Sequence, residues 1–199
     1  MALGKQAKTL SDKQIKAVLS HVEGTRYPAR DRVMVLLSVK AGLRAKEIAG
    51  LTWGMVTDSN GAVGDAIALE NKASKGKRGG RTIPLNAELR AALVDFHTIA
   101  QRDRKAGTDK PVIHSERGPG MSAASVTVWF HRLYDALGME GCSSHSGRRT
   151  FVTKAAKRVV EAGGSLRDVQ ELAGHSSLAT TQRYIQGDSD AKRKLVDLV

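Results

Sequence analysis

The sequence has little of what defines several large classes of protein. It contains a single cysteine, Cys142, among 199 residues, which excludes an intrachain disulfide framework and is typical of a reducing compartment. No apolar run approaches the roughly 18 residues that a membrane-spanning helix needs. The first ten residues, MALGKQAKTL, lack the apolar core of a secretory signal. We therefore expect a cytoplasmic protein with no membrane partner.

The familiar motifs of nucleotide, protease and metal sites are also missing. Neither Gly-Lys dipeptide is followed by Ser or Thr, so there is no Walker-type phosphate loop. No G-x-S-x-G or H-E-x-x-H pattern occurs. Cys142, His145 and His175 are too loosely spaced to make a good case for a zinc site. The sequence thus predicts neither a metal nor another cofactor.

Positive charge is present in clear excess. Thirty-two Lys and Arg residues stand against 20 Asp and Glu residues, and the formal net charge is +12. This balance is typical of a protein that binds a polyanion, although a merely soluble cationic protein has it too. Aromatic residues make up only 4% of the chain, too few for the stacking platforms of single-strand readers. Contacts to a duplex backbone are the favoured interpretation.

The hydrophobic pattern predicts a mainly α fold with a small antiparallel β-sheet (α+β). Ser11 is an expected N-cap, with Gln14 closing a capping box. The expected strands are 66–69 and 81–85, joined as a hairpin, with a further short strand at 112–113. Other helices are expected over 28–41, 44–51, from 86 onward, and over 123–137, 146–161, 166–173 and 178–185. We expect a disordered basic leader (1–9), one domain (10–187) and a tail helix (188–199).

Several residues that can handle phosphate chemistry stand near predicted helix ends. Arg44 precedes Glu47 by three residues, and His145 precedes Arg148 by three at a helix start, where backbone N–H groups favour anions. His175 follows a helix-ending glycine, and Tyr184 ends the next helix. Each feature alone has an ordinary structural explanation, such as a surface ion pair or a packing tyrosine. Together with the basic hairpin they indicate phosphoryl transfer by positioning and charge neutralisation.

Four of these motifs in this order resemble the catalytic domain of the tyrosine recombinases, the phage-integrase and Xer-type family. The motifs are the stretch GLRAKEI (42–48), HSGR (145–148), LAGH (172–175) and Tyr184. Their order and spacing match from about residue 8 to residue 186. The resemblance implies that fold, with DNA strand cleavage and rejoining in site-specific recombination or integration as the activity.

The resemblance also implies a role for each site residue. Tyr184 is the expected nucleophile, forming a 3′-phosphotyrosine without metal or ATP, while Arg44 and Arg148 clamp the phosphate. His145 assists removal of the tyrosine proton, His175 hydrogen-bonds the phosphate, and Glu47 orients Arg44. A hairpin lysine is the general acid, Lys75 before Lys77 and Lys72, while Arg78 and Arg81 are expected to contact the DNA backbone.

Double-stranded DNA is the expected partner. We expect the protein to come from a bacterium, a phage or a mobile element and to be associated with the nucleoid. We expect a free monomer that assembles on DNA as a dimer to tetramer, with the apolar stripe of the tail 188–199 docking in trans rather than on its own domain. An accessory DNA-bending or directionality protein is a further expected partner. Site-specific family members usually carry an additional N-terminal helical domain, and we expect this chain to lack it, either as an excised catalytic domain or as a natural minimal form. A non-catalytic DNA-binding module and a type IB-like topoisomerase are the alternatives.

Overall fold

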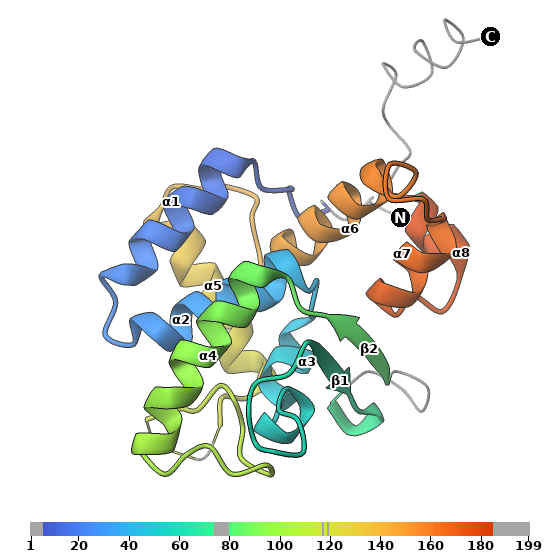
Figure 1. Cartoon of the computed structure of the whole chain (residues 1–199). Coiled ribbons are helices and arrows are strands. Elements are labelled where there is room, and N and C mark those ends of the chain that lie inside the picture. Colours follow the sequence, from blue (N-terminus) through green and yellow to red (C-terminus); the bar gives the residue numbers. More distant parts are fainter. Residues whose placement is uncertain (1–5, 74–79, 117, 119, 185–199) are drawn as a thin grey trace, which may run out of the picture.

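The computed structural model describes residues 6–73, 80–116, 118 and 120–184. Figure 1 shows the helices grouped into a larger body, with the small hairpin and two short helices on one side of it. The helices are α1 (Asp12–Glu23), α2 (Pro28–Lys40), α3 (Ala45–Gly50), α4 (Ala87–Arg102), α5 (Ala123–Ala136), α6 (Ser146–Arg158), α7 (Leu166–Ala173) and α8 (Leu178–Gln182). The strands are β1 (Ala66–Leu69) and β2 (Arg81–Pro84), and the 3₁₀ helices are η1 (Trp53–Met55) and η2 (Asn71–Ala73). The predicted fold class is confirmed.

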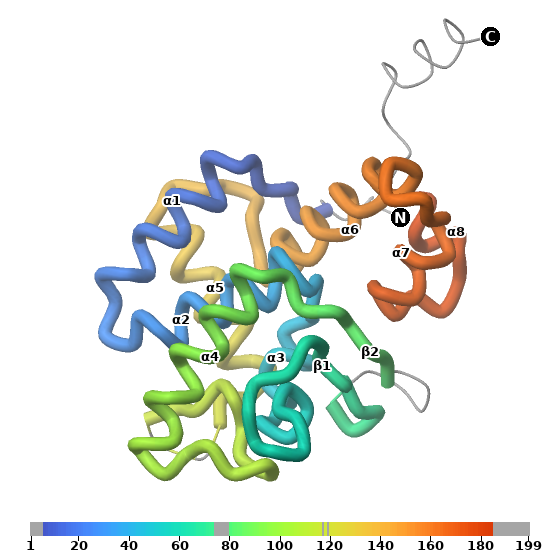
Figure 2. The backbone as a smooth tube through the Cα atoms, viewed as in Figure 1, coloured from blue at the N-terminus to red at the C-terminus, as the bar shows by residue number. Residues whose placement is uncertain are grey.

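Helix α2 is the centre of the larger body. Five consecutive residues, Val33 to Leu37, are at most 1% exposed, so this helix is surrounded by protein rather than covered on one face. It packs against α1, α4 and α6, and the tube in Figure 2 passes between them. The first turn of α6 packs on the C-terminal part of α2, where Gly147 lies against Ser38 and Val39, so the central core directly supports this turn.

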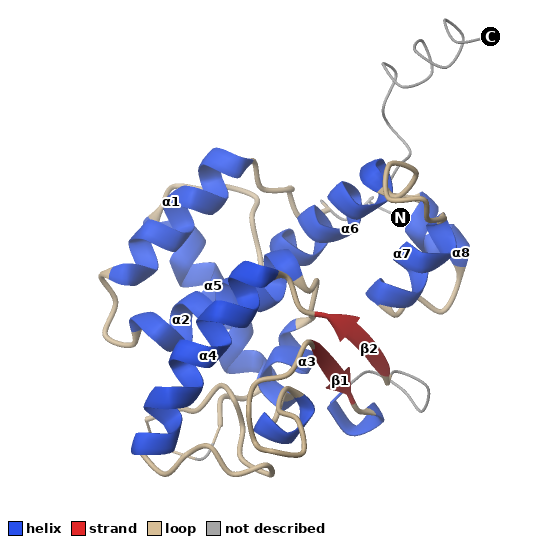
Figure 3. Ribbon diagram, in the orientation of Figure 1, coloured by secondary structure: helices blue, strands red, loops and turns tan. Residues whose placement is uncertain are grey.

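The hairpin is a two-stranded antiparallel sheet (Figure 3). Ala66 lies opposite Pro84 and Leu69 opposite Arg81, and the inward residues Ile67 and Ile83 are buried in the main core. Pro84 closes the ladder at its end, as a residue without an N–H group should. Leu69 and Arg81 form the other end of the ladder, next to the segment that connects the two strands.

A second, smaller core joins α6 to α7. It is made of Val152, Ala156, Val159, Val169 and Ala173, with Tyr184 packed against it. Helix α7 contacts α8, α6 and strand β2. The two short helices thus lie beside the far half of α6 and the hairpin (Figure 1), and Leu172 of α7 also packs against the main core.

Two local predictions need correction. Val112 and Ile113 are buried but form no strand, since the pairing there is an isolated bridge between Thr52 and Pro111. The leader 1–9 is not disordered throughout, because the Lys8 backbone donates a hydrogen bond to the Gly141 carbonyl at 3.0 Å. This backbone group finds its acceptor in the loop before α6, which a composition argument does not foresee. The predicted tail helix 188–199 lies outside the described residues.

Helix length and hydropathy also test the expectation of no membrane span. In the ranges that the structure describes, none of the helices has both the length and the apolar character needed to cross a membrane.

Candidate active site

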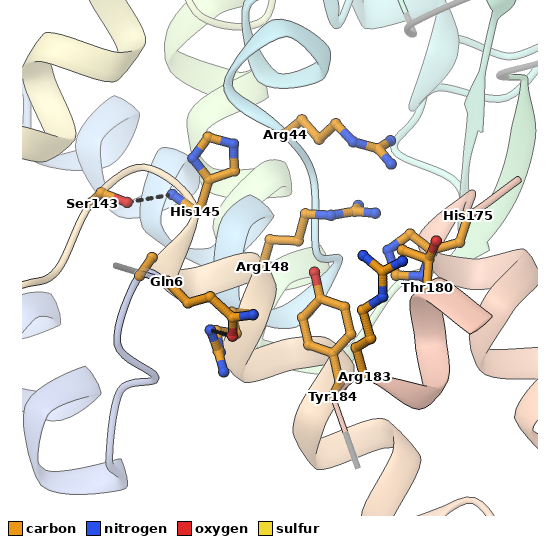
Figure 4. Close-up of a pocket in the computed structure, with 11 residues that line it drawn as sticks. Gln6, Arg44, Ser143, His145, Arg148, His175, Thr180, Arg183 and Tyr184 are labelled. Carbon is orange, nitrogen blue, oxygen red and sulfur yellow. Dashed lines mark hydrogen bonds between the residues drawn. The ribbon is translucent and has the colours of Figure 1, made fainter. Parts of the chain in front are cut away.

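A cleft of about 530 Å³ opens where the start of α6, the approach to α3 and the turn between α7 and α8 meet. Figure 4 shows its side chains converging from these elements. The lining residues are Gln6, Ala7, Arg44, Ser143, His145, Arg148, Arg149, His175, Thr180, Arg183 and Tyr184. This set includes five of the predicted catalytic residues: Arg44, His145, Arg148, His175 and Tyr184.

Three guanidinium groups gather on the last carbonyl groups of helix α7. Arg81 donates from Nε to the Leu172 carbonyl at 2.8 Å, and Arg148 donates to the Ala173 carbonyl at 2.5 Å. Arg44 donates to the Gly174 carbonyl at 3.2 Å. Carbonyls at a helix C-terminus have no partner within the helix and carry the negative end of its dipole. The end of α7 therefore holds three cations that would otherwise repel one another.

Gly174 makes this arrangement possible in two ways. Its φ of 60° lies in the left-handed region that ends helices and favours glycine. A Cβ atom at this position would lie 2.8 Å from a terminal nitrogen of Arg81. The glycine of the LAGH motif is thus needed both for the backbone turn and for the approach of an arginine.

Glu47 is the carboxylate at the centre of the cluster, and its side chain is fully buried. It accepts hydrogen bonds from the backbone and the guanidinium of Arg44, both at 2.8 Å, so the predicted contact is present. It also accepts two bonds from Arg81, at 3.0 and 3.1 Å. Burial raises its pKa, but the hydrogen bonds and charges of Arg81 and Arg44 outweigh burial and lower it to about 2. Glu47 is therefore ionised at neutral pH.

The cluster keeps a surplus of positive charge. Arg44, Arg81 and Arg148 contribute three positive charges and Glu47 one negative charge, which leaves two positive charges. Arg148 is 4% exposed, and burial, followed by the charge of Arg44, lowers its pKa to about 10. It is still protonated at neutral pH. A bound anion would stabilise this charge, so the electrostatics favour a phosphate between Arg44 and Arg148.

His145 stands at the first turn of α6, across the cleft from the α7 end (Figure 4). The residue is exposed, and its backbone N–H donates to the Ser143 hydroxyl at 3.3 Å. Two residues on, Gly147 packs so closely on α2 that a Cβ there would lie 2.2 Å from the Ser38 hydroxyl. Glycine thus lets the helix start sit deep in the core while His145 faces solvent.

His175 and Tyr184 are stacked, with ring centroids 5.6 Å apart and planes 17° from parallel. The His175 Nδ1 atom lies 2.9 Å from the buried Thr181 hydroxyl, which leaves Nε2 for another partner. Burial, followed by the charges of Arg148, Arg44 and Arg81, lowers the pKa of His175 to about 4. The Tyr184 hydroxyl points to the side of the cleft where Arg148, Arg44 and His145 lie (Figure 4).

The predicted site residues thus fall into two groups. Arg44, Glu47, His145, Arg148, His175 and Tyr184 are brought together around the cleft and the α7 end. Lys72 is exposed on η2 and pairs with Glu70 at 2.9 Å, outside the residues that line the cleft. Lys75, Lys77 and Arg78 lie outside the described residues.

Arg81 corrects an expectation. The sequence predicts that it contacts the DNA backbone from the surface, but its side chain is only 8% exposed. Its Nε and both terminal nitrogens are directed at Glu47 and the Leu172 carbonyl. The reason is tertiary, because the buried carboxylate 34 residues away and the helix end 91 residues away both attract the guanidinium.

The sequence analysis missed five polar residues of the cleft, Gln6, Ser143, Arg149, Thr180 and Arg183. The Arg149 guanidinium lies over the Tyr184 ring, 6.0 Å from its centroid, and donates to the Gln6 side chain. The available signals were the Arg148-Arg149 pair and the position of Arg183 directly before Tyr184. In the part of the chain that the structure describes, no three His, Cys, Asp or Glu side chains gather where they could hold a metal ion.

Comparison with known proteins places this geometry in context. Residues 8–190 match the model of the phage integrase family. The chain is 30% identical over 191 residues to a protein named tyrosine recombinase XerC from Actinobacillus pleuropneumoniae, covering 96% of this chain and 58% of that protein. It is 32% identical over 169 residues to a protein of the same name from Xylella fastidiosa, covering 84% and 52%. The chain therefore spans about half the length of the curated relatives it matches.

Solved structures agree on the fold. The XerA recombinase crystal structure aligns with a TM-score of 0.72 at 21% identity, covering 96% of this chain and 64% of that one. A lambda integrase dimer bound to a COC′ core site aligns with a TM-score of 0.62 at 20% identity, covering 89% and 47%. At these identities the likeness is evidence for the shared fold alone.

Proposed function

Because this chain belongs to the phage integrase family of tyrosine recombinases, we propose that it cleaves and rejoins DNA strands in site-specific recombination through a 3′-phosphotyrosine. The observation that carries the proposal is the surplus of two positive charges from Arg44, Arg81 and Arg148 beside Glu47, in contact with the cleft into which Tyr184 points. A scissile phosphate supplies the missing negative charge. Pure DNA binding would not need a nucleophile there.

In the proposed step, the Tyr184 oxygen attacks the phosphorus of a DNA phosphodiester. A bond forms between this oxygen and phosphorus while the bond from phosphorus to the 5′-oxygen breaks. His145, solvent-exposed at the cleft, takes the tyrosine proton. The phosphotyrosine retains the energy of the broken ester, so rejoining requires no ATP.

The arginines stabilise the transition state. Arg44 is held by Glu47 and the Gly174 carbonyl, and Arg148 by the Gly42 and Ala173 carbonyls, while both residues line the cleft. A planar fork can contact two non-bridging oxygens at once, which an ammonium cannot. Fixed donors of this kind need no reorganisation as charge develops.

His175 complements the arginines as a hydrogen-bond donor. In the tautomer in which Nδ1 accepts from the Thr181 hydroxyl, the neutral imidazole carries its proton on Nε2 and donates this hydrogen bond to a phosphate oxygen. Its low pKa, about 4, keeps the free ring neutral at physiological pH. The general acid for the leaving 5′-oxygen is assigned to Lys75, ahead of Lys77 and Lys72, on the resemblance to the family.

Double-stranded DNA is the proposed substrate, with the free protein a monomer and a dimer to tetramer forming on DNA. A formal charge of +12 opposes self-association until DNA neutralises it. Residues 10–187 are proposed as the catalytic domain, the tail 188–199 as a segment that docks in trans, and an accessory DNA-bending or directionality protein as a further partner.

The test is a search for a covalent adduct on a pool of nicked suicide duplexes, in which the short cleaved strand diffuses away. Wild type should form a protein–DNA adduct that survives denaturation. Tyr184→Phe should form none, while binding DNA within about 1 kcal/mol of wild type because only a hydroxyl is lost. Tyr27→Phe is the matched control. Adducts that persist in Tyr184→Phe would place the nucleophile elsewhere.

The same proteins separate the alternatives. A non-catalytic DNA-binding module forms no adduct with any duplex, whereas a type IB-like topoisomerase relaxes supercoiled plasmid that carries no specific site. A recombinase relaxes or recombines only plasmid with its site, which can be selected from the adduct-forming duplexes.

A further inference from the structure

Arg81 links three parts of the site that lie far apart in the sequence. It is the first residue of β2, directly after the hairpin loop. Its guanidinium faces both oxygens of Glu47, at 3.0 and 3.1 Å, and its Nε donates to the Leu172 carbonyl at 2.8 Å. Glu47 in turn holds Arg44 through the backbone and the side chain. One buried arginine thus connects the hairpin, the start of α3 and the end of α7.

We infer that Arg81 is a positioning residue, which sets the Arg44 guanidinium and the turn bearing His175 for the phosphate without touching DNA itself. The inference rests on the proposed function of the same site. A bidentate fork on Glu47 leaves that carboxylate one orientation, and this orientation also fixes Arg44. The bond from Arg81 to the Leu172 carbonyl fixes the position of the α7 end. There the Ala173 carbonyl accepts from Arg148 and the Gly174 carbonyl accepts from Arg44.

The geometry opposes a direct role in DNA binding. The Arg81 side chain is 8% exposed and is not among the residues that line the cleft, whereas Arg44 and Arg148 both line it. Nε and both terminal nitrogens of Arg81 are directed at protein acceptors. A phosphate would have to displace Glu47 to reach them, which would leave a buried carboxylate without its main partner.

The hairpin has other means of support. Strand β2 is paired with β1 over all four residues, and Ile83 is buried in the main core. A lysine at position 81 keeps a cation beside Glu47, so the buried carboxylate is not left with Arg44 as its sole charged partner among the described ion pairs. The position of Arg81 is therefore better explained by its effect on Arg44 and the α7 end than by a need to hold the strand.

Arg81→Lys is the decisive variant because it keeps the charge and loses the fork. Arg81→Gln removes the charge as well as the fork. Arg32→Lys is the matched control, since Arg32 pairs with Glu88 at 3.1 Å away from the cleft. On full-length protein, three quantities are measured: the single-turnover rate of adduct formation at saturating duplex, the half-saturating duplex concentration, and the unfolding midpoint in urea.

We expect Arg81→Lys to reduce the saturating rate by about 10- to 100-fold, the range typical of a misplacement near 1 Å. The half-saturating duplex concentration should change less than about twofold. The saturating rate of Arg81→Gln should be lower than that of Arg81→Lys. Arg32→Lys should match wild type. A raised half-saturation with an unchanged saturating rate would make Arg81 a DNA contact, and a rate loss that merely follows the fraction unfolded would make it structural. Either result overturns the inference.

A second measurement needs no DNA, so it separates this inference from the proposed function. In ¹⁵N-labelled protein, the Arg44 side-chain N–H signals, assigned with Arg44→Lys, report how rigidly the guanidinium is held. They should be ordered in wild type and in Arg32→Lys, and mobile in Arg81→Lys. Unchanged Arg44 signals would refute the positioning role even if adducts form. Absent wild-type adducts with mobile Arg44 signals would refute only the proposed function.

Discussion

The low pKa of His175 makes the stability of the fold depend on pH. In the unfolded chain the imidazole has its ordinary pKa of 6.5, and in the folded protein burial and three neighbouring arginines lower it to about 4. Between these values the unfolded chain binds more protons than the folded one. Folding therefore loses stability as the pH falls from about 6.5 to about 4, and regains it as the pH rises.

The size of the effect follows from the same two values. A difference of one pH unit corresponds to about 1.4 kcal/mol, so the move from 6.5 to about 4 has an upper limit of about 3 kcal/mol. Because the ring is only partly buried and lines an open cleft, solvent screening reduces this to about 1–2 kcal/mol. That is a large part of the stability of a domain of this size.

Urea unfolding of wild type and His175→Gln at several pH values measures the effect. Glutamine keeps a hydrogen-bonding side chain but does not titrate. Other groups with lowered pKa values, such as Glu47, His97 and His114, are present in both proteins, so their contributions largely cancel. Wild type should lose about 1–2 kcal/mol more than the variant between neutral pH and about pH 4.

If the free energies of unfolding of wild type and His175→Gln change in parallel with pH, this account of His175 is wrong. Inorganic phosphate supplies a further test, since an anion held by Arg44 and Arg148 favours the protonated imidazole and should reduce the pH dependence of wild type. If phosphate stabilises the protein equally at all pH values, the anion does not lie near His175.

Three further predictions concern single substitutions. Arg148→Lys should slow adduct formation by about 10²-fold at saturating DNA, because an ammonium cannot replace the fork on the phosphate; a near wild-type single-turnover rate would make Arg148 only a charge. Gly174→Ala should cost about 1–2 kcal/mol in urea unfolding from its left-handed backbone alone, and more where the new Cβ meets Arg81; a loss below about 0.5 kcal/mol would contradict the left-handed turn at this glycine. Gly147→Ala should cost about 1–3 kcal/mol through its contact with Ser38, and Ser38→Gly in the same protein should restore part of the loss, whereas equal losses with and without it would place the strain elsewhere.

Much of the fold could be predicted because its elements are specified locally. The capping box of Ser11 and Gln14 is formed, and Asn86 caps α4 through its side chain, as their positions before apolar stripes indicate. Gly174 ends α7 in the left-handed conformation that a glycine behind an amphipathic helix favours. These features depend on contacts within a few residues, which a sequence displays directly.

The parts that could not be predicted depend on contacts across the chain. The burial of Arg81 requires a carboxylate 34 residues earlier and a helix end 91 residues later. Arg149 enters the cleft because the leader residue Gln6 folds back beside it, 143 residues away in sequence. An arginine next to a basic loop is indistinguishable in sequence from a surface residue. The residues that face the cleft could therefore be predicted in large part, whereas the buried arginine that supports them could not.

The end of helix α7 has a consequence for how the site operates as a unit. Its three last carbonyls fix Arg81, Arg148 and Arg44, and the chain continues directly into His175, whose ring stacks on Tyr184. Arg44 and Arg148 belong to elements that the main core supports, and they meet the nucleophile at a helix end that the small core supports. Movement of α7 would separate its end from Arg44 and Arg148 and displace His175, so a disturbance of this small core should reduce catalysis before it unfolds the protein. In the proposed assembly on DNA, a neighbouring subunit that contacts α7 or α8 would act on all of these groups at once.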